Sequence, residues 1–195
     1  MTAAHPIDLF PHTASLFQPF LSAAEADRLF RSLGENLSWY QARLKLFGRW
    51  HWSPRVQCWI ADEGVAYTYS GLTMAPEPWP DDLARLRDLV SEVAGVRFNS
   101  VLCNWYRNGQ DSMGWHSDDE PELGEAPVVA SVTFGDERPF QFRRKGERRL
   151  ATSVPLGHNS LLVMPAGLQG DWQHGIPKTR KSVGPRLNLT FRRIL

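Results

Sequence analysis

From Phe98 onward, the chain is a series of short strand-like runs separated by turns that contain Gly or Pro. The expected strands are Phe98–Tyr106, Pro127–Phe134, Pro139–Arg143, Leu150–Val154, Ser160–Met164 and Arg186–Ile194. Many short strands with such turns are typical of a sandwich or barrel, and about eight strands fit a jelly roll. We therefore predict that residues 98–195 form a double-stranded β-helix (jelly roll), so that the fold class is mainly β with flanking helices (α+β).

Two helices are expected in residues 1–97, which we interpret as an N-terminal extension and a lid. Ser22-x-x-Glu25 predicts a capping box at the start of the first helix, and Gly34 predicts its end. The second helix is expected from Asp81 to Ala94, because its acidic start suits the helix N-terminus. Its predicted buried stripe is Leu83, Leu86, Leu89, Val90 and Val93. Three prolines within residues 1–20 predict an irregular arm before the first helix.

Residues 37–59 have strand character, and Gly48 and Pro54 predict a hairpin. Phe47 precedes the turn glycine in a segment that also carries Lys45 and Arg49. It could pack in the core, or it could be an exposed aromatic of the kind that wedges or stacks between nucleic-acid bases. Further along, alternation over residues 66–70 predicts a short strand with Tyr67 and Tyr69 on one side.

The composition is that of an ordinary globular protein, and 195 residues are expected to form a single domain, residues 1–195. The two cysteines favour a reducing compartment, and the first twelve residues resemble no signal peptide, so we expect a cytoplasmic protein, or a nuclear one in a eukaryotic host. No run is apolar enough for a membrane span. From residue 143 to 195 there are eleven Lys and Arg against two acids, which indicates either a polyanion-binding surface or solvated hairpin tips.

The segment Trp115–Glu120 concentrates an imidazole and three carboxylates in six residues. On extended backbone, His116 and Asp118 project from the same face because they are two residues apart. Together they provide two of the three ligands of the 2-His-1-carboxylate triad that binds non-haem Fe(II). Downstream, only His158 and His174 could supply the second imidazole. Alternatively, the pair is an ordinary ion pair in a solvated loop.

Two of the expected strands carry polar side chains on one face. In the segment 186–192, Arg186, Asn188, Thr190 and Arg192 alternate with Leu187, Leu189 and Phe191. Asn104 and Tyr106 share one face of the strand that precedes His116. If the strands close into a barrel, these faces line its interior and could bind a small dicarboxylate, since Arg pairs with carboxylates in a bidentate manner. A half-exposed edge strand is the alternative explanation.

These motifs, in this order and spacing, resemble the AlkB family of Fe(II)- and 2-oxoglutarate-dependent dioxygenases over roughly residues 44 to 195. The resemblance is strongest to the members that repair duplex DNA. Segments at 99–102, 130–135 and 185–195 are also similar to that subgroup. The resemblance implies an enzyme that uses O2 and 2-oxoglutarate to remove alkyl groups from 1-methyladenine- or 3-methylcytosine-type bases in DNA, and releases each group as an aldehyde.

It also implies the residues that carry this activity. His116, Asp118 and His174 would bind Fe(II). Arg186 would pair with the distal carboxylate of 2-oxoglutarate, aided by Asn104, Tyr106 and Asn188, and Arg192 would lie near the metal-bound end of the co-substrate. The flipped base would be held by Tyr67, Tyr69, Asp119 and Glu120. Phe47 corresponds to the finger residue that fills the gap left by the extruded base, and Arg55 corresponds to a DNA-contacting position.

Two departures from the duplex-specific pattern leave strand preference open. Thr179 stands where a cation is expected, and the segment around Gly146 is shorter than in those relatives. We expect a monomer that acts on duplex or single-stranded DNA, with no membrane partner. The alternatives are a demethylase of methylated RNA and a catalytically silent jelly-roll domain that binds nucleic acid.

Overall fold

Two facing β-sheets form the centre of this computed structural model, which describes residues 3–46, 48–65, 67–69, 72–74 and 76–195. The larger sheet contains, in spatial order, β1 (His5–Leu9), β2 (His12–Phe17), β13 (Ser160–Met164), β10 (Val129–Gly135), β15 (Arg186–Arg192), β8 (Ser100–Tyr106) and β5 (Val56–Ala61). The smaller sheet contains β12 (Thr152–Leu156), β11 (Arg138–Arg144), β14 (Trp172–Ile176) and β9 (Met113–His116). The predicted mainly β, jelly-roll fold is confirmed.

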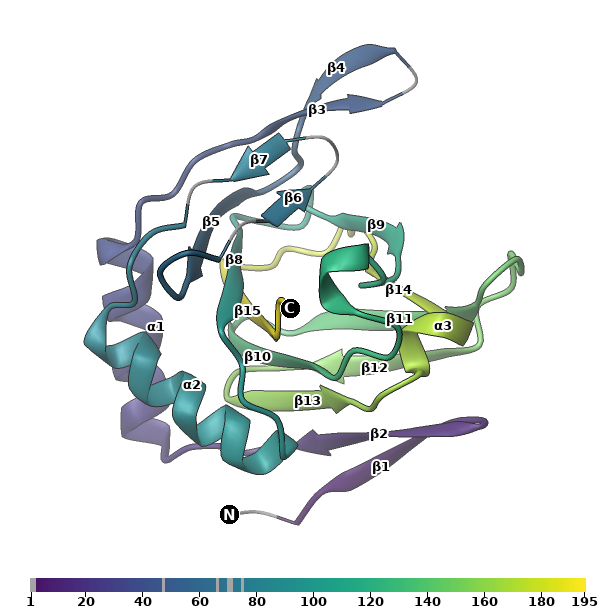
Figure 1. Cartoon of the computed structure of the whole chain (residues 1–195), viewed down its shortest axis with the longest axis horizontal. Coiled ribbons are helices and arrows are strands. Elements are labelled where there is room, and N and C mark those ends of the chain that lie inside the picture. Colours follow the sequence, from purple (N-terminus) through teal and green to yellow (C-terminus); the bar gives the residue numbers. More distant parts are fainter. Residues whose placement is uncertain (1–2, 47, 66, 70–71, 75) are drawn as a thin grey trace.

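The larger sheet has two different neighbours. On one face, Leu187, Leu189 and Phe191 of β15 pack against α1 (Ala23–Asn36) and α2 (Asp81–Ala94), the two helices beside the sheet in Figure 1. On the other face, Leu162 and Met164 of β13 pack in one cluster with apolar residues of the smaller sheet. The apolar side of the predicted alternation in β15 therefore lies under the helices, so its polar side faces the space between the sheets.

The first twenty residues correct the sequence prediction of an irregular arm. β1 and β2 form an antiparallel pair at the edge of the larger sheet, and β2 continues the sheet by pairing with β13. Leu9 and Ala14 are buried in the cluster between the sheets. Proline is tolerated at sheet edges, so the three prolines did not exclude strands here.

The first helix extends past the predicted end. It begins after Ser22, whose hydroxyl accepts a hydrogen bond from the Glu25 amide, but it continues through Gly34 to Asn36. Gly34 has a packing role, because a Cβ there would lie 2.8 Å from the ring of Trp105.

The second helix has the predicted bounds, and Gly95 ends it in the left-handed conformation. Leu89 corrects the predicted stripe, since it is 47% exposed.

The predicted hairpin is present as β3 (Arg43–Leu46) and β4 (Arg49–Trp52), with a positive φ at Gly48. Figure 1 shows it projecting from the body of the molecule, near the smaller pair β6 (Tyr67–Tyr69) and β7 (Leu72–Met74). Phe47 lies outside the described residues. Two short helices complete the elements, η1 (Pro121–Leu123) and α3 (Leu168–Asp171).

The proposed division at residue 97 remains a proposal, and strands from both sides of it share the larger sheet. β5 pairs with β8 along six residues, and β1 and β2 form the opposite edge. Within the described residues, no helix is long and apolar enough to cross a membrane.

Candidate active site

The metal-ligand motif lies on two neighbouring strands of the smaller sheet. His116 ends β9 and is paired with His174 of β14, so the two imidazoles lie side by side with ring centroids 4.3 Å apart. Asp118 follows the end of β9 by two residues, and its Oδ2 lies 3.5 Å from Nε2 of His174. A ligand atom from each of the three residues lies within 4.8 Å of the others, close enough to hold one metal ion. Strand pairing therefore brings together residues that are far apart in the sequence.

Local hydrogen bonds orient this group. Nδ1 of His116 lies 2.9 Å from the carbonyl oxygen of Gly114 and donates to it, which leaves Nε2 as the nitrogen with a free lone pair. The amide of Asp118 donates to the buried side chain of Gln169 at 3.0 Å. The hydroxyl of Ser117 donates to the carbonyl of Trp172 at 2.8 Å, so the loop after β9 is tied to β14.

The protonation states suit metal binding. Burial would raise the pKa of the Asp118 carboxyl, but Arg192, which donates a hydrogen bond to it, and the neighbouring His174 and His116 together outweigh burial and lower the pKa to about 2. Burial is the main cause that lowers the pKa of His174 to about 3, and the neighbouring His116 contributes to the same shift. At neutral pH the site therefore offers an ionised carboxylate and a neutral imidazole at His174, the forms that bind metals.

A pocket between the sheets opens beside these three residues, and polar side chains of the larger sheet line it. The lining residues are Asn104, Tyr106, Met113, His116, Asp118, Ser131, Phe140, Met164, His174, Gly175, Ile176, Asn188, Thr190 and Arg192. Asn104 and Asn188 are paired across β8 and β15, as the two predicted polar faces require. Asn188 donates to the hydroxyl of Ser131 at 2.8 Å, so β10 fixes its amide. The edge-strand alternative is wrong, because β15 lies between two strands.

Arg186 is fully buried, behind the lining of this pocket. Its guanidinium lies 5.2 Å from the ring centre of Tyr106 and donates to the hydroxyl of Thr133 at 2.9 Å. Burial lowers the pKa of Arg186 to about 10, so the side chain stays cationic at neutral pH. Two of its nitrogens, Nε and Nη1, have no hydrogen-bond partner among the described residues. A buried cation with unused donors is complementary to a carboxylate.

A buried polar atom without a hydrogen-bond partner also supports a metal ion at His116, Asp118 and His174. Oδ2 of Asp118 is buried without a hydrogen-bond partner in the described part of the chain, and Nε2 of His174 lies 3.5 Å from it. Two imidazoles and one carboxylate form the donor set of non-haem Fe(II) sites. His158, the competing histidine of the sequence analysis, instead accepts a hydrogen bond from the amide of Gly135 and lies 3.4 Å from Asp27. The residues present therefore fit both Fe(II) and an anionic co-substrate.

The residues expected to contact DNA or the flipped base have different surroundings. Asp119 is exposed and forms an ion pair with Lys145 at 2.7 Å, whereas Glu120 is partly buried. The backbone of Tyr67 and Tyr69 forms β6, and their side chains lie outside the described part of the structure. Arg55 is only 2% exposed and donates to Asn104 at 2.7 Å, and its expected contact with DNA stays a prediction.

Several supporting residues were not identified from the sequence. Ser131 and Thr133 alternate with apolar neighbours in β10, the same signal that identified β15. The guanidinium of Arg143 stacks on the ring of Trp115, 4.5 Å from its centre. Arg138 is buried and donates to the backbone carbonyls of Asn108, Asp111 and Pro177, so it connects the loop before β9 to the loop after β14. Because its partners are backbone atoms of distant loops, no sequence pattern predicts it.

Comparisons with known proteins agree with this geometry. Residues 13–192 match the family described as the 2OG-Fe(II) oxygenase superfamily. The human protein named DNA oxidative demethylase ALKBH2 is 44% identical over 182 residues, which cover 88% of this chain and 70% of that protein. The human alpha-ketoglutarate-dependent dioxygenase alkB homolog 3 is 40% identical over 188 residues, covering 92% of this chain and 65% of that protein.

A solved structure described as "The structure of OsALKBH1" superposes with a TM-score of 0.67 at 18% sequence identity, and covers 97% of this chain and all of that chain. At this identity the likeness supports the fold alone. It agrees with the two-sheet jelly roll described above.

Proposed function

The chain belongs to the 2OG-Fe(II) oxygenase superfamily, and from this we propose that it is an Fe(II)- and 2-oxoglutarate-dependent dioxygenase that oxidatively dealkylates N-alkylated bases in DNA. The observation that carries the proposal is the arrangement of His116, Asp118 and His174 in a pocket that Arg192 also lines, with Arg186 buried next to the lining residue Tyr106. The relatives named as DNA oxidative demethylases support DNA as the substrate.

Each residue has a proposed task. His116, Asp118 and His174 hold Fe(II), and Arg186 pairs with the distal carboxylate of 2-oxoglutarate. Asn104, Tyr106 and Asn188 line the co-substrate pocket, and Arg192 orients Asp118 near the end of the co-substrate that binds the metal. When bound, Fe(II) and 2-oxoglutarate activate O2, and 2-oxoglutarate is oxidised to succinate and CO2.

One oxygen atom is transferred to the alkyl carbon on the base nitrogen. The resulting hydroxyalkyl group leaves as an aldehyde, formaldehyde for a methyl group, and the normal base is restored. As the carbon–nitrogen bond breaks, its electron pair stays on the base nitrogen, the carbon–oxygen double bond of the aldehyde forms, and the hydroxyl proton is released to solvent.

The substrate class follows from the need to bring a base to this pocket. We assign 1-methyladenine- and 3-methylcytosine-type lesions, because their pairing is already weakened and extrusion costs less than for a normal pair. Tyr67, Tyr69, Asp119 and Glu120 hold the extruded base, and Phe47 fills the vacated position in a duplex. We also propose that the protein acts as a monomer, in the cytoplasm or in a eukaryotic nucleus.

A turnover assay tests the proposal. The protein is incubated with methylated oligonucleotides in single-stranded DNA, duplex DNA and RNA form, with and without Fe(II). We expect Fe(II)-dependent loss of the methyl group from DNA together with an equal amount of succinate. Asp118→Ala should abolish both, even with excess metal, because the triad loses its carboxylate. DNA binding without succinate would support the silent binding domain, and turnover of RNA alone would assign the RNA alternative.

A further inference from the structure

Arg55 is a buried cation whose hydrogen-bond partners among the described residues are neutral. It lies between β4 and β5, at the base of the projecting hairpin, and is 2% exposed. Its Nε donates to Oδ1 of Asn104 at 2.7 Å, and Nη1 donates to the carbonyl of Ser112 at 3.5 Å. Nη2 has no hydrogen-bond partner among the described residues. Burying a guanidinium without a carboxylate partner is costly, so folding stability alone does not explain this arginine.

The contact with Asn104 determines which way that amide points. A guanidinium can only donate hydrogen bonds, so the amide atom that faces Arg55 must be the oxygen. The Nδ2 group of Asn104 is therefore directed away from Arg55, and Asn104 lines the pocket beside the triad. A pocket for an anionic ligand needs donors, whereas an amide oxygen turned into it would repel a carboxylate.

Without Arg55, the two orientations of the amide differ only by a half-turn about χ2 of Asn104. Asn104 pairs in register with Gln57 of β5 and Asn188 of β15, so its backbone is fixed from both sides. The strands therefore place the side chain at the pocket, and Arg55 selects its orientation.

We propose that Arg55 is a positioning residue for the co-substrate: by occupying the amide oxygen of Asn104, it keeps the Nδ2 donor of Asn104 turned toward 2-oxoglutarate. Arg55 itself is not among the residues that line the pocket. This inference rests on the proposed function, because it requires a carboxylate-bearing co-substrate in the pocket. The DNA contact expected for Arg55 stays a separate prediction.

The test is a double-mutant cycle on co-substrate binding in the absence of O2. Mn(II) replaces Fe(II), and the Kd of 2-oxoglutarate is measured by calorimetry for wild type, Arg55→Met, Asn104→Ala and the double variant. The Kd of Mn(II) alone and the melting temperature are measured for each. Arg85→Met is the matched control, because Arg85 is an exposed arginine that pairs with Asp82 far from the pocket. Arg55→Lys, which keeps a donor, tests rescue.

We expect Arg55→Met to raise the Kd of 2-oxoglutarate about tenfold, which is about 1.4 kcal/mol, while Mn(II) binding stays unchanged. In the Asn104→Ala background the same substitution should change the Kd by less than about twofold, since a positioning residue acts only through its partner. Arg55→Lys should recover most of the loss, and Arg85→Met should have no effect.

An equal loss in both backgrounds would overturn the proposal, and so would an unchanged Kd in Arg55→Met. If Arg55→Met does not fold, Arg55→Gln replaces it, since its shorter amide no longer reaches Asn104. Failure of the proposed function is a different result, because wild type itself would then bind no 2-oxoglutarate.

Discussion

At the scale of single residues, the site depends on buried charges that are only partly compensated. Arg192 neutralises Asp118, whereas Arg186 keeps two donors without partners in the described part of the chain. Buried donors without partners destabilise the ligand-free protein, and they gain hydrogen-bond partners when an anion binds. The affinity for the co-substrate should therefore be concentrated in a few side chains.

Arg186→Ala tests whether a few side chains provide most of the affinity for 2-oxoglutarate. Losing one partner of a buried charge pair costs about 2–5 kcal/mol, so the Kd of 2-oxoglutarate should rise at least about 30-fold. Binding can be measured by calorimetry with Mn(II) in place of Fe(II). Arg193→Ala is the control, because Arg193 follows the strand that contains Arg186 but is exposed to solvent. Equal affinities of wild type and Arg186→Ala would refute the assigned role.

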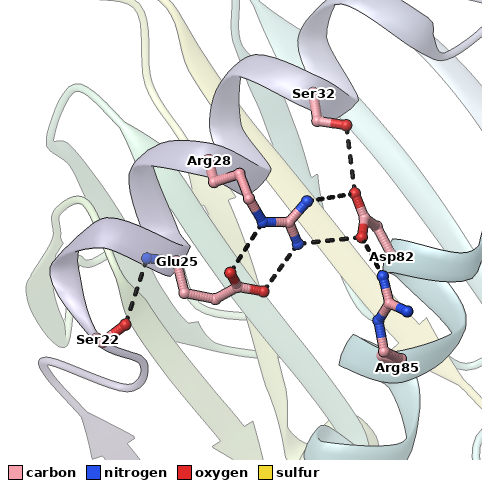
Figure 2. Close-up of polar contacts among 6 residues, drawn as sticks. All are labelled: Ser22, Glu25, Arg28, Ser32, Asp82 and Arg85. Carbon is pink, nitrogen blue, oxygen red and sulfur yellow. Dashed lines mark hydrogen bonds and ion pairs between the residues drawn. The ribbon is translucent and has the colours of Figure 1, made fainter.

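At the scale of elements, α1 and α2 are held together by charged side chains above their apolar contact. Figure 2 shows the carboxylate of Asp82 accepting hydrogen bonds from Arg28, Ser32 and Arg85. Arg28 also binds Glu25 of its own helix. Hydrogen bonds from Arg28 are the main reason that the pKa of Asp82 falls to about 2, and they outweigh the opposing effect of burial.

The lowered pKa predicts a pH-dependent contribution to stability. An unfolded Asp titrates near 3.9, so the contribution is complete above about pH 4 and is lost as the pH falls toward 2. Asp82→Asn should lower the free energy of unfolding at pH 7 by about 1 kcal/mol, a reduced value because the arginines are solvated. Urea unfolding at several pH values would measure it, and the difference should narrow below pH 4.

Asp88→Asn is the matched control for this experiment, since Asp88 is 69% exposed and pairs only with Arg87 of its own helix among the described residues. A difference between Asp82→Asn and wild type that stays constant from pH 7 to pH 2 would contradict the link to ionisation.

The β3–β4 hairpin is the second element with a testable role. Residues 37–61 contain no acidic residue, and the hairpin exposes Trp50 and Trp52 to 59% and 62%. Arg43 stacks against both rings, so the hairpin presents aromatic and positive groups together. This supports a nucleic-acid contact, since bases stack on aromatic side chains and phosphates attract cations.

Phe47→Ala should slow repair of a duplex lesion about tenfold, because base–aromatic stacking is worth about 1–3 kcal/mol. The same lesion in a single strand should be repaired almost normally, because its extrusion leaves no gap in a duplex for Phe47 to fill. Initial rates on the two oligonucleotides measure the ratio. Equal losses on both, together with a lower melting temperature, would mean that Phe47 belongs to the core.

At the scale of the whole molecule, ligands should stabilise the jelly roll, because the site joins both sheets. Two of the triad residues, His116 and His174, lie on the smaller sheet, and Asp118 follows β9. Most of the other polar residues of the pocket lie on the larger sheet. A ligand that binds only the folded protein at 100 times its Kd adds about 2.7 kcal/mol. For a chain of this size, the melting temperature should rise by about 5–10 °C.

Thermal unfolding with Mn(II) and 2-oxoglutarate together measures this rise, and chelation of the metal should reverse it. His174→Ala should remove the effect of the metal, because its imidazole is one of the three proposed ligands. A full stabilisation in that variant would place the metal elsewhere.

Local patterns in the sequence predicted much of this protein. The alternation in β15 and the stripe of α2 depend on neighbours a few residues away, and the structure has them as expected except for Leu89. His116 and Asp118 also lie close together, although Asp118 lies in a bend just after β9 and not on extended backbone. The jelly roll itself followed from the number and spacing of short strands. These features were predictable because backbone geometry alone sets their periods.

Tertiary structure decided the features that depend on pairing between distant segments. It joined β1 and β2 to the larger sheet and paired β14 with β9, so that His174 reaches Asp118. It also placed the ring of Trp105 so close to α1 that only glycine fits at position 34. It also buried Arg55 against Asn104. A sequence pattern shows which side chains share one face of a strand. It does not show contacts between distant residues, which form only when the strands pair in register. Arg55 and Asn104 are 49 residues apart, and Arg192 and Asp118 are 74 residues apart.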